Sequence, residues 1–258
     1  MLRIVHIDAP QGPTSYNLLA ERDYTIGRNE GDIKFPHDPS MKKRHAKLEV
    51  SHSIGNLANP MITPTIAITP IVRGAIITAT NRGSDEAFDI GEKADIGDGQ
   101  KFSLGGIPNV FEIHYTPFVA VFSGRIQGEI QLQIQQLGGH SLRQWCKDAT
   151  HLVTDEVELS LDVCGALLAG KPLVTQGFIT KLLSFYKKEI NTKPDPQDYL
   201  PLVAARSLDT NEPIPASAFK PNPDRASLFQ GKTFVLRTMP LLNDSKAVIA
   251  AGGWDLRI

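Results

Sequence analysis

The stretch YTIGR at residues 24–28, followed by SMKKRHA at residues 40–46, decides the fold of the first part of the chain. The first stretch begins as a short apolar run and reaches a turn at Gly27, and the second is a basic loop that leads into another apolar run. Short apolar runs separated by turn residues are typical of β-strands. Comparable runs lie at residues 2–7, 17–20, 76–79 and 110–115. Residues 1–116 are therefore predicted to form an all-β sandwich or barrel, in which residues 51–75 form a long loop with at most one strand.

A different pattern begins at Pro117. The continuous apolar run at residues 118–122 is typical of a strand buried on both faces. Apolar residues at helical spacing from Ile126 to Leu137 predict a helix that ends at two glycines. Further strands are predicted at residues 150–153 and 173–174, and further helices at residues 161–169 and 178–186. Strands that alternate with helices indicate a parallel sheet covered on both sides, so residues 117–190 are predicted to form an α/β domain.

The last part of the chain repeats the middle part. Residues 191–226 are rich in proline and are predicted to be a linker. The motif LGGHSL at residues 137–142 returns as AGGWDL at residues 251–256. The same offset places the strand-like residues 118–123 on residues 232–237, where a strand is again expected. Residues 227–258 are therefore predicted to be the N-terminal part of a second, truncated copy of the α/β domain.

The composition excludes several classes of function. The formal net charge is −1, whereas proteins that bind nucleic acid through its phosphates usually carry a strong basic excess, so strong direct nucleic-acid binding is not expected. No run of about 20 apolar residues predicts a membrane span. The two cysteines, Cys146 and Cys164, match neither a disulfide framework nor a zinc motif, and they favour a reducing compartment. We expect neither a metal nor a cofactor.

The basic loop is a candidate phosphate-binding site. A phosphate dianion is bound well by the rigid fork of an arginine and by the point charge of a lysine. Two loops at one end of a sandwich would bring Arg28 close to Lys42 and Lys43. The alternative is that residues 42–47 are only a solvated basic stretch, as most runs of charge are.

The succession Gly27-Arg28, basic loop, His45-Ala46 resembles the forkhead-associated (FHA) domain, a β-sandwich that binds phosphothreonine peptides. The resemblance implies that Arg28 contacts the phosphate or its supporting loop, and that His45 and Gly27 support the loop. It also places Lys42 and Lys43 where that family has its phosphate-binding Ser and Arg.

The third FHA motif, Asn-Gly-Thr, has no clear match in this sequence. Asn81 could replace it as a clamp on the peptide backbone. The acidic pair Asp85-Glu86 occupies the region of the motif, and it would repel a phosphopeptide rich in acidic residues.

The middle part resembles a BRCT domain, on the strand at residues 118–122, the motif THLV at residues 150–153 and the motif GKPLV at residues 170–174. The resemblance implies a four-stranded parallel sheet with three helices and a phosphoserine pocket after the first strand. Ser123 and Gly124 match the first half of that pocket.

The second half of the pocket departs from the BRCT pattern. Where that family has a lysine at the start of the second helix, this chain offers Ser160 and Asp162, and the carboxylate of Asp162 would repel phosphate. The alternative role for Ser123 is an N-cap of the helix that contains Ile126.

The order FHA, BRCT, BRCT resembles the nibrin family, also in the segments YTPFVA at residues 115–120 and FQGKTF at residues 229–234. This resemblance implies a non-catalytic, nuclear regulatory subunit of the Mre11–Rad50 complex in DNA double-strand-break repair and checkpoint signalling. Its partners would be phosphorylated repair and checkpoint proteins with acidic Ser/Thr motifs, and Mre11 and Rad50 would bind regions beyond this chain.

Two other hypotheses remain open. In the first, the chain is a structural interaction module whose phosphate sites have degenerated. In the second, it is an enzyme that uses a nucleotide at GKT, residues 231–233. The P-loop motif needs a glycine where Ala226 stands, and it follows a strand instead of preceding one, so no enzyme is expected.

Overall fold

The structure is a computed structural model that describes residues 1–8, 12–73, 77–81, 84–88, 90–105, 109–235 and 237–254. Of residues 77–81 and 84–88 it describes the backbone alone. The chain divides into two compact units. We call them the sandwich unit (Met1–Asn56, Met61–Pro117 and Gln135–Gly138) and the α/β unit (Leu57–Pro60, Phe118–Ile134 and Gly139–Ile258). Among the described residues, no helix has the length and apolar character needed to cross a membrane.

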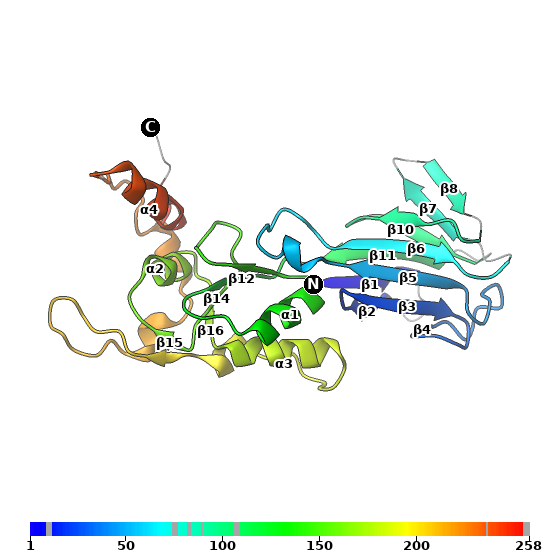
Figure 1. Ribbon diagram of the computed structural model, residues 1–258, viewed down its shortest axis with the longest axis horizontal. Coiled ribbons are helices and arrows are strands. Elements are labelled where there is room, and N and C mark those ends of the chain that lie inside the picture. The colour runs from blue at the N-terminus through cyan, green and yellow to red at the C-terminus, as the bar shows by residue number, and fades with distance from the viewer. Residues whose placement is uncertain are drawn as a thin grey trace. The chain divides into compact units, whose positions relative to one another are not determined.

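The sandwich unit contains two β-sheets (Figure 1). The six-stranded sheet has the order β2-β1-β11-β10-β7-β8, made by β1 (Leu2–His6), β2 (Thr14–Leu18), β7 (Ile77–Asn81), β8 (Ser84–Phe88), β10 (Lys101–Leu104) and β11 (Asn109–Tyr115). The five-stranded sheet has the order β4-β3-β5-β6-β9, made by β3 (Arg22–Gly27), β4 (Ile33–Lys34), β5 (Ala46–Ser51), β6 (Thr65–Pro70) and β9 (Ala94–Ile96). All neighbours are antiparallel except β3 and β4. The predicted sandwich is confirmed.

The period of two residues explains how the sandwich buries its core. In β5, Ala46, Leu48 and Val50 are buried, while Lys47 and Glu49 between them reach the outer face. The core also takes in buried residues of β1, β3, β6, β9, β10 and β11. The segment predicted as a long loop holds one strand, β6, preceded by the short helix η1 (Ile54–Asn56).

The α/β unit contains a four-stranded parallel sheet of order β13-β12-β14-β16. Its elements are β12 (Val119–Phe122), α1 (Gly128–Gln136), β13 (His140–Leu142), β14 (His151–Val153), α2 (Leu161–Leu168), β16 (Leu173–Val174) and α3 (Gln176–Tyr186). All four residues of β12 are buried, because helices cover both faces: α1 and α3 lie on one side and α2 on the other (Figure 1). The predicted sheet and its three helices are confirmed.

Side chains at the two faces of this sheet explain the packing. On one face, Gly165 of α2 lies against the buried ring of Trp145, where a Cβ would be 2.4 Å from the indole. On the other face, the ring of His151 lies between Phe118 and Phe178, at 5.0 and 5.2 Å between centroids. Burial lowers the pKa of His151 to about 4, so the ring is neutral near pH 7.

The proline-rich segment predicted as a linker packs onto the α/β unit. It forms η2 (Pro196–Tyr199), β17 (Leu202–Val203), η3 (Ala216–Phe219) and η4 (Pro223–Ser227). Strand β17 pairs in parallel with β15 (Glu156–Val157), and the side chains of Ala205 and Phe219 are buried in the core of the unit. The segment is therefore an extended connection that is fixed by burial of a few apolar residues.

The predicted second copy is present only in part. Helix α4 (Met239–Ala251) begins at the N-cap Thr238, covers the residues that match α1, and packs against α2 with Val248 in the core. The strand expected at residues 232–237 does not form over the described residues 232–235. A strand needs a backbone partner, and no described segment pairs with these residues.

Candidate phosphate-binding site

Two loops of the sandwich unit lie directly against each other. They are residues 28–32, between β3 and β4, and residues 35–45, between β4 and β5, and together we call them the paired loops. The backbone N–H of Arg28 donates to the carbonyl oxygen of Lys42 at 2.8 Å, and the N–H of Glu30 donates to that of Lys43 at 3.1 Å. These two bonds bring the predicted residues Arg28, Lys42 and Lys43 together at one end of the five-stranded sheet.

Gly27 makes the close approach of these loops sterically allowed. A Cβ at Gly27 would lie 2.1 Å from the carbonyl oxygen of Lys43 and 2.7 Å from that of Glu30. Both obstacles are backbone atoms, which cannot rotate away as a side chain could. The resemblance to the FHA domain implied that Gly27 supports this loop, and the two carbonyl oxygens explain why a glycine is needed at this position.

His45 shapes the second loop from inside. It is fully buried, and its Nδ1 accepts a hydrogen bond from the backbone N–H of Lys42 at 3.1 Å. Its own N–H donates to the carbonyl oxygen of Ile26 at 2.8 Å. The imidazole thus fixes the backbone of Lys42 and leaves the exposed surface of the loop to the lysines.

Sequence analysis missed two further residues that hold this loop. The carboxylate of Asp38 accepts hydrogen bonds from the backbone and the hydroxyl of Ser40, at 2.8 and 2.6 Å, and from the side-chain amide of Asn109. Met41 is only 2% exposed and inserts into the sandwich core. The signal for Asp38 was available, because an Asp that bonds the N–H two residues later is a common turn.

The charges of the paired loops remain available to an anion. The Nε of Arg28 is buried and has no hydrogen-bond partner within the part of the chain that the structure describes. The side chains of Lys42 and Lys43 are exposed. Among the described residues, these three cations form one ion pair, between Lys43 and Glu30 at 3.8 Å; both side chains are more than half exposed, and such pairs are weak.

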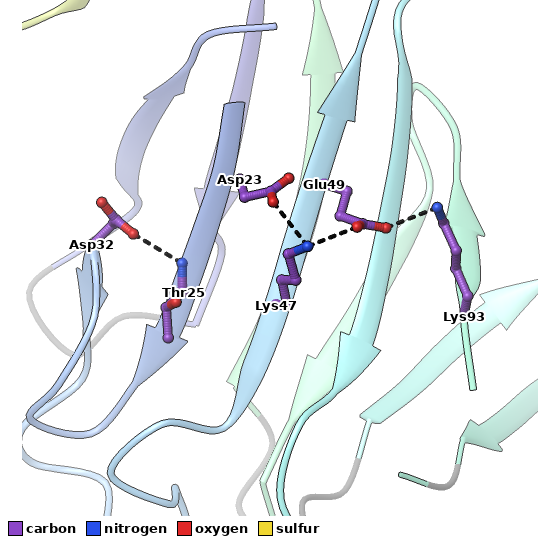
Figure 2. A network of polar contacts seen from close by, with 6 residues as sticks. All are labelled: Asp23, Thr25, Asp32, Lys47, Glu49 and Lys93. Atoms are coloured by element: carbon purple, nitrogen blue, oxygen red, sulfur yellow. Dashed lines mark hydrogen bonds and ion pairs between the residues drawn. The ribbon is translucent and has the colours of Figure 1, made fainter. Parts of the chain in front are cut away.

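Lys47 belongs to the predicted basic stretch but not to this site. Figure 2 shows it on the outer face of the five-stranded sheet, between Asp23 and Glu49, with its Nζ 2.8 Å from a carboxylate oxygen of each. Lys93 approaches the other side of Glu49, also at 2.8 Å. Two carboxylates therefore already form ion pairs with Lys47. The candidate phosphate-binding site consists of the paired loops without Lys47.

Asn81 and the acidic pair at residues 85–86 lie on the β7–β8 hairpin. The backbone of Asn81 pairs with that of Ser84 at the end of the hairpin. Their side chains fall outside what the structure describes, so the clamp role of Asn81 and the repulsion by Asp85 and Glu86 stay predictions. Elsewhere along the described chain, no group of His, Cys, Asp and Glu has the arrangement of a metal site.

Ser123 and Gly124, for which a phosphoserine pocket is predicted, line a cavity with acidic walls. Its volume is about 360 Å³. The lining residues are Phe122, Ser123, Gly124, Arg125, Val153, Thr154, Asp155, Glu156, Glu158 and Gln176. Three carboxylates and one guanidinium line this cavity, so the repulsion between like charges disfavours the binding of a phosphate dianion.

Two expectations about this pocket are wrong. Asp162 does not line it: its carboxylate accepts a hydrogen bond from the backbone N–H of Trp145 at 2.7 Å. Ser123 is not an N-cap, because α1 begins only at Gly128. Ser160 does cap α2, and its hydroxyl accepts from the N–H of Val163.

A β-sandwich of two sheets, followed by a four-stranded parallel sheet with three helices, defines an FHA–BRCT architecture. Solved structures of S. pombe Nbs1 have this fold. The Nbs1–Ctp1 complex matches with a TM-score of 0.60 at 16% identity over 72% of this chain and 59% of that chain. The Nbs1 FHA-BRCT1-BRCT2 domains match with a TM-score of 0.59 at 16% identity over 77% of this chain and 66% of that chain.

In sequence, the chain is similar to nibrins over most of its length, so the predicted resemblance is confirmed. It is 26% identical to mouse nibrin over 97% of this chain and 32% of that protein. It is 23% identical to chicken nibrin over 100% and 33%, and 25% identical to a rice nibrin homolog over 79% and 38%. The chain thus spans about a third of the length of these relatives. No protein-family profile matches it.

Proposed function

We propose that this chain is a non-catalytic adaptor that binds phosphothreonine peptides at the paired loops of its sandwich unit. The observation that carries the proposal is the loop contact that sets the partly exposed Arg28 beside the exposed Lys42 and Lys43. A phosphothreonine carries about −1.5 to −2 charges and three acceptor oxygens, so it can accept from the guanidinium of Arg28 and pair with both lysines.

Typical hydrogen-bond energies indicate how much Arg28 would contribute to the free energy of binding. A hydrogen bond to a charged group contributes about 1.5–3 kcal/mol, against about 0.5–1.5 kcal/mol for a neutral one. The lysines are exposed, and we expect them to contribute less each.

The similarity to nibrins supports a cellular setting. We place the chain in a nuclear scaffold for DNA double-strand-break repair and checkpoint signalling, with phosphorylated partner proteins that carry acidic Ser/Thr motifs. Mre11 and Rad50 would bind regions outside this chain. The S. pombe Nbs1–Ctp1 complex supports the binding of a partner protein by this fold.

Calorimetric titration of the 258-residue chain tests the proposal. The ligand is an acidic peptide with one threonine, phosphorylated or plain. We expect micromolar binding of the phosphorylated form alone, and a loss of about tenfold or more for Arg28→Ala, since 1.4 kcal/mol is a factor of ten. Lys181→Ala, on the exposed surface of α3, removes the same charge and serves as the control. Equal binding of both peptides would reject the proposal.

The acidic cavity favours the second candidate function for the α/β unit. With Asp155, Glu156 and Glu158 around Ser123, this unit fits a structural module whose phosphate site has degenerated. A phosphoserine peptide is then expected to bind no better than plain peptide, and Ser123→Ala to change nothing. Selective binding that Ser123→Ala abolishes would show instead that the phosphoserine pocket works.

A further inference from the structure

The paired loops carry three carboxylates beside their basic residues. Two of these carboxylates hold the loops in shape. Asp32 accepts a hydrogen bond from the backbone N–H of Thr25 at 2.9 Å (Figure 2). Asp38 accepts from the backbone and the hydroxyl of Ser40, at 2.8 and 2.6 Å. The third carboxylate, that of Glu30, has no such structural role.

Glu30 presents its carboxylate at the surface, next to the proposed phosphate site. Its side chain is 55% exposed, and that of Lys43 is 70% exposed. Over the described ranges of the chain, the carboxylate of Glu30 makes a single polar contact, the ion pair with Lys43 at 3.8 Å. An exposed ion pair of this length is weak, so either partner can exchange it for a stronger one.

The backbone of Glu30 is fixed against the second loop. Its N–H donates to the carbonyl oxygen of Lys43 at 3.1 Å, and its own carbonyl oxygen lies 2.7 Å from where a Cβ of Gly27 would be. The next residue, Gly31, packs equally closely on Thr25, because a Cβ there would lie 2.5 Å from the carbonyl oxygen of Thr25. The side chain of Glu30 therefore starts from a fixed point beside Lys43.

Binding of a phosphothreonine changes the charges around Glu30. The phosphate carries about −1.5 to −2 charges, so Lys43 pairs with it in preference to the single charge of a carboxylate. The carboxylate of Glu30 then loses its cation and lies close to a dianion, and like charges repel each other. A cation from the peptide would take the place of Lys43 and offset this repulsion.

We propose that Glu30 is a specificity-determining residue that selects peptides with a lysine or arginine near the phosphothreonine. The basic side chain of the peptide pairs with Glu30, while the phosphate pairs with Arg28 and the two lysines of the paired loops. The inference rests on the proposed function and adds a sequence preference to it. At the one peptide position that faces Glu30, a basic residue is favoured over an acidic one, even where the rest of the motif is acidic.

A lysine scan by calorimetric titration tests the inference. The probes are alanine-rich phosphothreonine peptides with one lysine at successive positions on either side, each paired with a glutamine version. We expect one position where Lys binds about two- to fivefold tighter than Gln, the effect of one exposed ion pair. In Glu30→Gln, this difference is expected to vanish while the preference for phosphorylated peptide remains. Glu189→Gln, at an exposed position after α3, removes the same charge and is expected to keep the difference.

The outcomes separate the two proposals. If phosphorylated peptides bind selectively but no position favours Lys over Gln, or Glu30→Gln keeps the preference, the role of Glu30 is rejected and the proposed function stands. The role of Glu30 is also rejected if Glu189→Gln removes the preference to the same extent, because the preference then comes from overall charge. If phosphorylation makes no difference to the wild-type chain, both proposals fall.

NMR of the wild-type chain gives a check that needs no variant. The side-chain carboxyl carbon of Glu30 is expected to shift more with the best Lys peptide than with its Gln partner, because the carboxylate gains a cation only from the first. Equal shifts with the two peptides would overturn the inference.

Discussion

At the scale of single residues, the candidate site depends on the absence of a side chain at Gly27. Gly27 lets two loops approach until their backbones share hydrogen bonds, and this contact sets Arg28 beside Lys42. His45 then fixes the backbone of Lys42 from within the core. The site is thus built by residues that need not touch a ligand.

Replacing Gly27 by alanine tests this geometry. The added Cβ meets two carbonyl oxygens, so the loops must separate, and overpacking of this kind costs about 1–3 kcal/mol. We expect a lower melting temperature of the sandwich unit and phosphothreonine binding weakened about tenfold or more. Gly55→Ala is the control, because its nearest obstacle is a side chain at 3.7 Å. Unchanged binding in the Gly27 variant would show that the loop contact is not needed.

Sequence reasoning reached part of this site and missed the rest for identifiable reasons. Arg28, Lys42 and Lys43 could be grouped because short strands flank both loops. The pairing of Lys47 with Asp23 and of Asp162 with Trp145 could not be predicted, since these residues become neighbours only through sheet register and tertiary packing.

At the scale of elements, periodicity predicted most strands and all three helices of the parallel sheet. It missed β4, β9, β13, β15 and β17, which have two or three residues and carry no readable period, and it also missed the longer strands β8 and β10. Their existence is decided by neighbours: β4 pairs with β3, and β13 pairs with β12. The converse holds at residues 232–235, where a strand-like pattern without a described partner stays irregular.

The ion network across β3, β5 and the segment before β9 makes stability depend on pH (Figure 2). Lys47 and Lys93 lower the pKa of Glu49 to about 2. A lowered pKa stabilises the fold above the unfolded value of about 4.3, and this stabilisation is lost as the pH falls through about 2. Glu49→Gln is therefore expected to be less stable at pH 7 and to converge with the wild type near pH 2, as measured by urea unfolding at low salt. A difference that stays constant down to pH 2 would contradict this assignment.

Helix α2 offers a test of packing against propensity. Alanine in place of Gly165 would favour the helix by about 1 kcal/mol. The added Cβ would lie 2.4 Å from the buried ring of Trp145, and such overpacking costs about 1–3 kcal/mol or more. We expect a net loss of stability in thermal denaturation. Gly128→Ala, at the start of α1 with nothing within 4 Å, is expected to be neutral or slightly stabilising. A more stable Gly165 variant would mean that the ring can move aside.

At the scale of the whole molecule, the proposed function depends on local charge and not on net charge. The chain carries a formal charge of −1, yet it concentrates Arg28, Lys42 and Lys43 on one pair of loops and carboxylates around Ser123. This uneven distribution suits an adaptor that reads one phosphate on a protein better than one that binds a nucleic-acid backbone. The FHA–BRCT fold and the similarity to nibrins agree with that role.

The Nε–H resonance of Arg28 gives the most direct test of the account. In a ¹H–¹⁵N NMR titration of the whole chain, this resonance is expected to shift strongly with a phosphothreonine peptide, because the guanidinium gains a charged acceptor. It is expected to stay in place with the same peptide unphosphorylated. If the phosphorylated peptide binds and shifts other residues while the Arg28 Nε–H does not move, the phosphate is bound elsewhere and the central claim is wrong.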